Sequence, residues 1–223
     1  ESGSFTINPN VDLETMAEGA DILIKVNEYL PGPNPTDGFM NIQGDNITTN
    51  GGDIILWANA SNRSSGTADN QINLYGGNTL NSNGGKIVLA GGLDDGGASS
   101  GLAGLTAGDG IPDGYAYRGD LNYSAVIISD NVTLLSGGGD VIIRGQSGGT
   151  PPNVFPRSFG VWADAGFKLD AGTGTINIRG LSESESAIWL GTTETEGALS
   201  PIAITSASTA ANAITIHGES TTN

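Results

Sequence analysis

One short phrase recurs six times along this chain, and it limits the possible folds more than any other feature. Each copy places turn residues ahead of an aliphatic run. The copies are Gly19-Ala20-Asp21-Ile22-Leu23-Ile24, Gly52-Asp53-Ile54-Ile55-Leu56, Gly85-Lys86-Ile87-Val88-Leu89, Gly139-Asp140-Val141-Ile142-Ile143, Gly174-Thr175-Ile176-Asn177-Ile178 and Asn212-Ala213-Ile214-Thr215-Ile216. The phrase returns about every 33 residues, apart from one long step between Lys86 and Asp140. This spacing predicts a solenoid that carries one long loop, residues 91–123.

Two further strand-like phrases accompany the main one in nearly every repeat. Those before it are residues 5–7, 46–48, 78–80, 131–134, 167–169 and 202–204, and those after it are 39–42, 72–74, 126–128, 161–163 and 188–190. Three strands per repeat predict an all-β fold, a right-handed parallel β-helix of about five to six three-stranded coils. An antiparallel β-sandwich is the alternative, but it does not require one phrase to recur at a fixed place.

Side chains alternate between the two faces of a strand, so the main strands can be compared column by column. One expected inward column is Ile22, Ile54, Ile87, Val141, Ile176 and Ile214, and the second is Ile24, Leu56, Leu89, Ile143, Ile178 and Ile216. Aliphatic columns of this kind form the core. We treat residues 1–223 as a single β-helix domain and expect a fragment of a larger protein, because neither end has an obvious polar cap.

The charge balance narrows the range of partners. The chain has 8 Lys and Arg residues against 24 Asp and Glu, for a net charge of −16. Such a body is repelled by nucleic acid and by anionic membrane surfaces, so neither is expected as a partner. There is no cysteine and therefore no disulfide or thiol chemistry. No apolar run approaches the length of a membrane span, so no membrane insertion is expected.

Two outward columns hold the candidate ligand-binding residues. Ile127, Trp162 and Trp189 are expected to face outward on the strand after the main one, with the two indoles one coil apart. They can stack on sugar rings, unless a loop such as 91–123 or 145–158 covers them. Beside the main strand, Arg144 and Arg179 can receive an acidic polysaccharide by bidentate pairing. The alternative is that these arginines pair with Asp and Glu side chains of adjacent coils.

The long loop offers a possible calcium site. Its segment Asp109-Gly110-Ile111-Pro112-Asp113-Gly114 is similar to the end of the Asp-rich calcium loops of bacterial surface proteins. Two of the usual acidic positions are occupied by Leu105 and Ala107, so calcium binding requires Asp94 or Asp95 to fold back. A Gly/Asp turn without metal is the alternative.

The same loop contains the tripeptide Arg118-Gly119-Asp120 between Tyr117 and Leu121. It resembles integrin-binding motifs, and a protruding loop would present it well. Tripeptides also arise by chance, so the motif alone is weak evidence.

Two phrases, residues 47–57 and 132–143, look like coils of filamentous-haemagglutinin-type exoproteins. These are large adhesins of Gram-negative bacteria that are exported by two-partner secretion. The resemblance covers about residues 40–220 and is one of repeat style. It implies a right-handed β-helix, a secreted or cell-surface location and a role in adhesion. It carries no binding residues over, because this style of repeat has no fixed site.

An enzyme is the main alternative, because parallel β-helices also include polysaccharide hydrolases and lyases. Hydrolysis needs clustered carboxylates, and Asp94-Asp95 is the only adjacent pair of acids. A lyase needs a base near bound calcium, and Arg118 with Tyr115 or Tyr117 is the one candidate. We assign no catalytic residue and expect an adhesin segment that binds a glycan or a host-surface protein. A passive structural shaft is the third possibility.

Overall fold

The chain folds into an all-β parallel solenoid of about five turns, which confirms the predicted fold class. The computed structural model describes residues 4–26, 38–62, 69–119, 123–148, 158–164, 166–183, 186–191 and 200–220. Within these ranges no helix has the length and apolar character that crossing a membrane requires.

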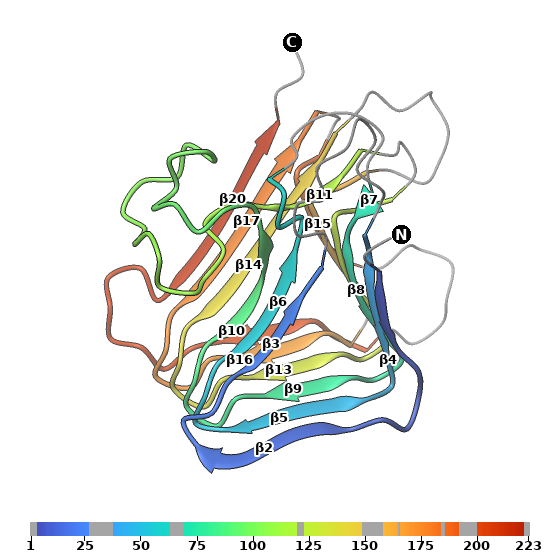
Figure 1. Cartoon of the computed structure of the whole chain (residues 1–223), viewed down its shortest axis with the longest axis vertical. Coiled ribbons are helices and arrows are strands. Elements are labelled where there is room, and N and C mark those ends of the chain that lie inside the picture. The colour runs from blue at the N-terminus through green and yellow to red at the C-terminus, as the bar shows by residue number, and fades with distance from the viewer. Residues whose placement is uncertain are drawn as a thin grey trace.

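Three sheets enclose a common interior (Figure 1). Sheet A consists of β1 (Phe5–Ile7), β4 (Met40–Gln43), β8 (Ile72–Tyr75), β12 (Val126–Ile128), β15 (Val161–Ala163) and β18 (Ile188–Leu190). Sheet B consists of β2 (Leu13–Glu18), β5 (Asn46–Asn50), β9 (Thr79–Asn81), β13 (Thr133–Leu135), β16 (Lys168–Asp170) and β19 (Ala203–Thr205). Sheet C consists of β3 (Ile22–Lys25), β6 (Ile54–Ala58), β10 (Ile87–Gly91), β14 (Val141–Ser147), β17 (Ile176–Ser182) and β20 (Ile214–Ser220), with the short strands β7 (Asp69–Asn70) and β11 (Ala116–Arg118) at its margin.

Each strand pairs in parallel with its equivalent in the next coil, and the register aligns the repeated phrases. In sheet C, Ile22 pairs with Ile54, which in turn pairs with Ile87. Ile54 and Ile87 are fully buried. The inward columns predicted for the main strands are therefore the core of the molecule, except for Ile214 and Ile216 of the last strand, which are exposed. Removing the surface of the buried members from water provides most of the stability.

The first coil differs from the sequence-based assignment. Residues 5–7 were expected in the sheet that precedes the main strands, yet β1 pairs with β4 and belongs to sheet A. The first strand of sheet B is instead β2, which pairs with β5 through Leu13 and Glu14. The sequence of β2 conceals this role, because its six residues include the charged Glu14 and Glu18 and only one large aliphatic residue, Leu13.

The corner between sheets B and C explains why the repeated phrase begins with glycine. The Ser82 hydroxyl donates to the carbonyl oxygens of Gly85 and, in the next coil, Ser136. This bonding draws the coils together. A Cβ atom on Gly85 would lie 2.0 Å from the Gly52 carbonyl oxygen of the preceding coil. The same close approach recurs at Gly52, Gly139 and Gly174. Any side chain at these positions would force neighbouring coils apart.

Candidate functional site

The outer face of sheet C carries one column of chemically distinctive side chains. The register aligns Lys25 with Trp57 and Trp57 with Ala90. In the next coil Arg144 continues this column; it pairs with Arg179, and Arg179 pairs with His217. The whole column is Lys25, Trp57, Ala90, Arg144, Arg179 and His217. Neighbouring members are about 4.8 Å apart, because that is the spacing of paired strands.

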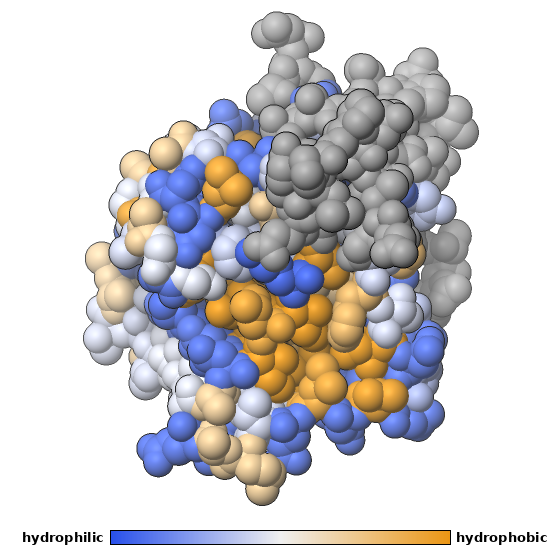
Figure 2. All heavy atoms as spheres, in the orientation of Figure 1, coloured by the Kyte–Doolittle hydropathy of each residue, from blue (hydrophilic) through white to orange (hydrophobic). Residues whose placement is uncertain are grey.

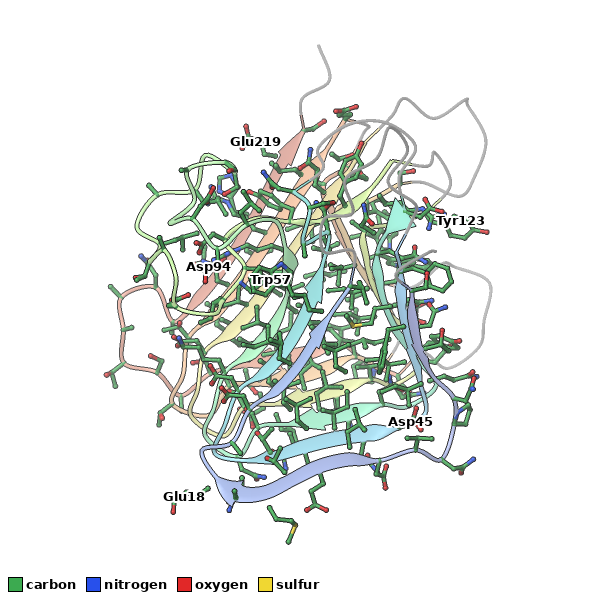
Figure 3. All side chains as sticks on the ribbon, in the orientation of Figure 1. Glu18, Asp45, Trp57, Asp94, Tyr123 and Glu219 are labelled. Carbon is green, nitrogen blue, oxygen red and sulfur yellow. The ribbon has the colours of Figure 1, made fainter. Side chains whose placement is uncertain are left out.

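The long loop folds back onto this face and covers the middle of it (Figure 1). The indole N–H of Trp57 donates to the carbonyl oxygen of Gly92 (2.8 Å), at the start of the loop. Ile111 packs from the loop against outward-facing apolar residues of the sheet, and together they form a second small core: Ile55, Trp57, Ala60, Val88, Ala90 and Ile111, with Ile142 at its edge. In Figure 3, Trp57 is labelled on the sheet and Asp94 in the loop beside it.

The four aspartates predicted as calcium ligands hold the loop in shape. Asp94 accepts hydrogen bonds from the backbone N–H groups of Gly108 and Gly110 (2.6 and 2.8 Å). The other three act alike: Asp113 accepts from Gly96, Asp95 from Gly97 and Ser99, and Asp109 from Ile111. Among the described residues, no three His, Cys, Asp or Glu side chains converge as a metal site would require. Calcium binding here stays a prediction.

Arg144 lies beneath the loop and is 5% exposed. Its Nη1 donates to the carbonyl oxygen of Pro112 (3.0 Å), which fixes the guanidinium against the loop. Burial lowers the pKa of this arginine, and the charge of Arg179 adds to the effect, while Asp113 opposes it. Asp113 is also buried, and its own pKa is raised by burial above the ordinary value.

Arg179 lies one coil beyond Arg144, at the margin of the loop, and is only half-buried. Its Nε atom is buried without a hydrogen-bond partner, and its guanidinium makes no ion pair within the described structure. The alternative in which Arg144 and Arg179 pair with acidic residues of adjacent coils is therefore not seen among these residues. Burial raises the pKa of the nearby Tyr115 phenol, and Arg179 and Arg144 oppose this rise.

The tryptophan column on sheet A is partly covered. The register pairs Ile127 with Trp162 and Trp162 with Trp189, so the two indoles lie one coil apart, as their spacing predicts. Both indoles are half-buried and Ile127 is buried. Phe159 stacks on Trp189 with ring centroids 5.5 Å apart. The surface is therefore neither the open platform nor the fully covered core that the sequence left as alternatives.

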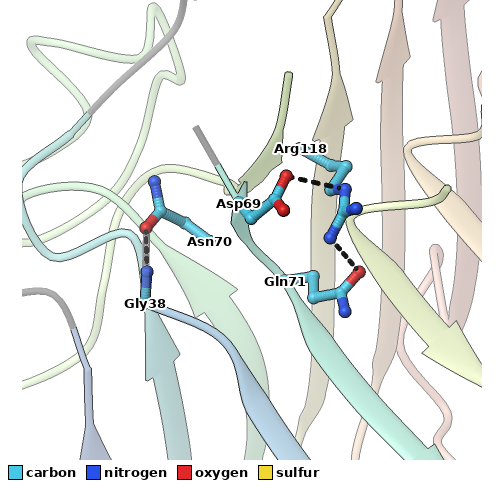
Figure 4. A network of polar contacts seen from close by, with 5 residues as sticks. All are labelled: Gly38, Asp69, Asn70, Gln71 and Arg118. Carbon is cyan, nitrogen blue, oxygen red and sulfur yellow. Dashed lines mark hydrogen bonds and ion pairs between the residues drawn. The ribbon is translucent and has the colours of Figure 1, made fainter. Parts of the chain in front are cut away.

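The arginine of the Arg118-Gly119-Asp120 motif is buried and does not protrude; with Asp69 and Gln71 it forms a set of polar contacts that we call the clasp. Arg118 is 6% exposed, its Nε lies 2.9 Å from a carboxylate oxygen of Asp69, and its Nη1 donates to Gln71 (2.9 Å; Figure 4). Its guanidinium also lies over the ring of Tyr123, 4.8 Å from the centroid. Asp120 lies outside the described residues. The integrin-like motif stays a prediction, and one that would require Arg118 to leave this clasp.

The same burial affects the residues considered for a lyase. Tyr117 is 1% exposed and Tyr115 is 6% exposed, so neither phenol is open to a polymeric substrate. Arg118 is held by Asp69.

Sequence reasoning missed the second core beneath the long loop, although a signal for it was present. The strands β6 and β10 read IILWA and IVLAG, which are continuous apolar runs without the alternation of a one-sided strand. Continuous runs are typical of strands that are covered on both faces. They could have indicated that a loop packs on the outside of sheet C.

Comparisons with protein-family models, with curated proteins and with solved structures found no match to this chain.

Proposed function

We propose that this chain is the ligand-binding part of an adhesin that is secreted or displayed on the surface of a Gram-negative bacterium, of the filamentous-haemagglutinin type. Its ligand is an acidic glycan that docks on the outer face of sheet C. The observation that carries this proposal is Arg179, a half-buried cation without an ion pair in the described structure and with an orphaned Nε.

The chemistry of the column favours a carboxylate or sulfate group. A guanidinium presents a rigid fork that matches a carboxylate with two parallel hydrogen bonds. Arg144 cannot rotate away, because Pro112 holds it, and it adds positive charge one coil from Arg179. An anion bound at Arg179 would relieve the repulsion between these two stacked cations.

The acidic body does not prevent this binding. The net charge is −16, but salt screens charges beyond about 8 Å at physiological ionic strength. A carboxylate in contact with Arg179 therefore responds mainly to the local cations Arg144 and Arg179. The long-range repulsion slows the approach of an anionic polymer, and added salt reduces that repulsion.

We propose binding without turnover. Glycoside hydrolysis requires two carboxyl groups at the substrate, one of them an acid with a raised pKa. Asp113 has a raised pKa, but it is 2% exposed within the loop. A bound chain on the outer face of sheet C would not reach it.

The test is retardation of the purified chain on gels cast with polygalacturonate or with its methyl-esterified, neutral form. We expect retardation by the acidic polymer alone. Arg179→Gln should abolish it, and Arg179→Lys should retain only part, because lysine keeps the charge but lacks the fork. Lys168→Gln is the matched control, since it removes one exposed cation from sheet B.

Each contrary result has a distinct meaning. Equal retardation of Arg179→Gln and the unmodified chain would refute the site. Retardation by the neutral polymer that is lost in a Trp162→Ala/Trp189→Ala variant would move the ligand to the tryptophan column. Newly released sugar ends would indicate an enzyme, and no retardation by any polymer would favour a structural shaft.

A further inference from the structure

The column on the outer face of sheet C continues past the long loop. The loop covers its middle members, because Trp57 lies in the second core and Arg144 is held by Pro112. Arg179 and His217 follow on β17 and β20, and the register pairs them in successive coils. They are the first two members beyond the loop and lie about 4.8 Å apart. Figure 2 shows a mixture of hydrophilic and apolar residues at the upper left of the molecule, where the loop lies in Figure 1.

His217 offers a hydrogen-bond donor at the surface. Its side chain is exposed, and its imidazole makes no hydrogen bond or ion pair within the described structure. An imidazole ring carries at least one N–H group in either protonation state, so it can donate to a carboxylate. Side chains stand roughly perpendicular to a sheet, so this access does not depend on whether another strand pairs with the edge of β20.

The surroundings of Arg179 indicate the direction in which a bound chain continues. Along β17 the neighbouring outward residues are Asn177 and Leu181, and neither carries a charge. Towards the preceding coil, the loop covers Arg144. His217, in the following coil, is therefore the one basic and uncovered neighbour of Arg179 on the described part of this face.

One acidic side chain borders the column. Glu219 lies two residues beyond His217 on β20 and faces the same side of the sheet; Figure 3 labels it near the end of this strand. It is exposed and forms no ion pair within the described structure. Its charge opposes the binding of an anionic group at His217.

We propose that the ligand of sheet C is a glycan that carries acidic groups on successive sugars, with one group bound at Arg179 and the next at His217. The glycan chain then runs along the solenoid axis, across the strands. A sugar ring and its linkage advance a glycan by a length similar to the spacing of two paired strands, so neighbouring groups meet neighbouring coils. This inference rests on the proposed function and adds the class of ligand, a polyuronate in which every sugar is acidic.

Calorimetric titration with galacturonate and with its dimer tests this pairing. The dimer should bind about tenfold more tightly than the monomer, because its second carboxylate gains a hydrogen bond. His217→Ala should remove this gain and leave monomer binding unchanged. Thr215→Ala is the matched control, since it shortens another outward side chain of β20 and should keep the gain. Glu219→Gln should tighten binding of the dimer, and circular dichroism checks that each variant is folded.

A second ligand tests the spacing of the acidic groups. Acidic and neutral sugars alternate in a hyaluronate tetrasaccharide, so its carboxylates are two sugars apart and cannot meet successive coils. It should bind no more tightly than galacturonate, and His217→Ala should not change its affinity.

The contrary results separate this inference from the site at Arg179. If Arg179→Gln abolishes binding but the dimer binds no better than the monomer, the site stands and the pairing with His217 is refuted. A gain that survives in His217→Ala, or hyaluronate that binds as tightly as the dimer, refutes the pairing in the same way. If Arg179→Gln binds the dimer as tightly as the unmodified chain does, or if neither sugar binds, the site and the pairing are both wrong.

Discussion

Replacing Gly85 with alanine tests the argument that coil stacking, and not backbone conformation, requires glycine at the start of the repeated phrase. The new Cβ atom would lie 2.0 Å from the carbonyl oxygen of Gly52 and 2.3 Å from its carbonyl carbon. Both atoms belong to the backbone and cannot move aside as a flexible side chain could. The two coils must therefore separate at this corner.

The cost follows from what that separation breaks. Two hydrogen bonds join the coils here, from the Ile54 N–H to the Lys86 carbonyl (2.9 Å) and from the Lys86 N–H to a carboxylate oxygen of Asp53 (2.7 Å). Each contributes about 1 kcal/mol. Overpacking adds about 1–3 kcal/mol. The expected loss for Gly85→Ala is thus about 3–5 kcal/mol in the free energy of unfolding, or about 10 °C in Tm for a chain of this size.

Gly84→Ala is the matched control, because it tests the other property of glycine. Gly84 has φ +119°, which disfavours alanine, but no atom lies within 4 Å of its Cβ position. Its cost should be about 1–2 kcal/mol. Unfolding by urea, followed by circular dichroism, measures both variants. If Gly84→Ala destabilises the protein as much as Gly85→Ala, the stacking argument is wrong.

Three further predictions concern the long loop and its clasp. Trp57→Phe removes the hydrogen bond to the Gly92 carbonyl and should lower the free energy of unfolding by about 1–3 kcal/mol. It should also speed proteolysis within residues 92–115. Unchanged cleavage would contradict the role of the indole in holding the loop on sheet C. Arg118→Ala should lower the free energy of unfolding by about 2–3 kcal/mol, which is less than the loss of a fully buried pair because the Asp69 side chain is 26% exposed. A double-mutant cycle with Asp69→Ala measures the coupling between the two side chains. If the losses of the two single variants add up to that of the double variant, the two side chains are not coupled. Burial raises the pKa of Asp113 above the ordinary 3.8, so the folded state binds this proton more tightly than the unfolded chain does. The contribution of Asp113 to stability therefore falls as pH rises from 3.8 to the folded-state pKa and is constant above it. Asp113→Asn should flatten that fall in a plot of unfolding midpoint against pH, and an unaltered slope would argue against burial as the cause.

The sequence predicts the solenoid well because each coil obeys the same steric rules. Ile54 and Leu56 recur as Ile87 and Leu89 one period later, and only stacked coils bury both pairs equally. The first coil was harder to assign, because β2 carries the charged residues Glu14 and Glu18 and Leu13 is its one large aliphatic residue.

The candidate site could be predicted only in part. The register of Arg144 and Arg179 follows directly from the repeat. The position at which a Gly-rich loop packs on the sheet does not follow from the repeat. It depends on contacts such as that of Ile111 with the outer face of sheet C, which no periodicity encodes. For the same reason the sequence shows the tripeptide that contains Arg118 but not the long-range clasp with Asp69.

The parallel pairing of each coil with its neighbours has a consequence for the order in which the molecule folds. Apart from β7 and β11, every strand of the three sheets pairs with its equivalent in the next coil, and an unfinished edge serves as the template for the next strand. A polypeptide that becomes available from one end can therefore add coils in sequence, each docking as soon as its residues are free. The segment from β10 to β14 interrupts this progression, because β11 must also meet β7 from an earlier coil. We expect it to be the slowest step.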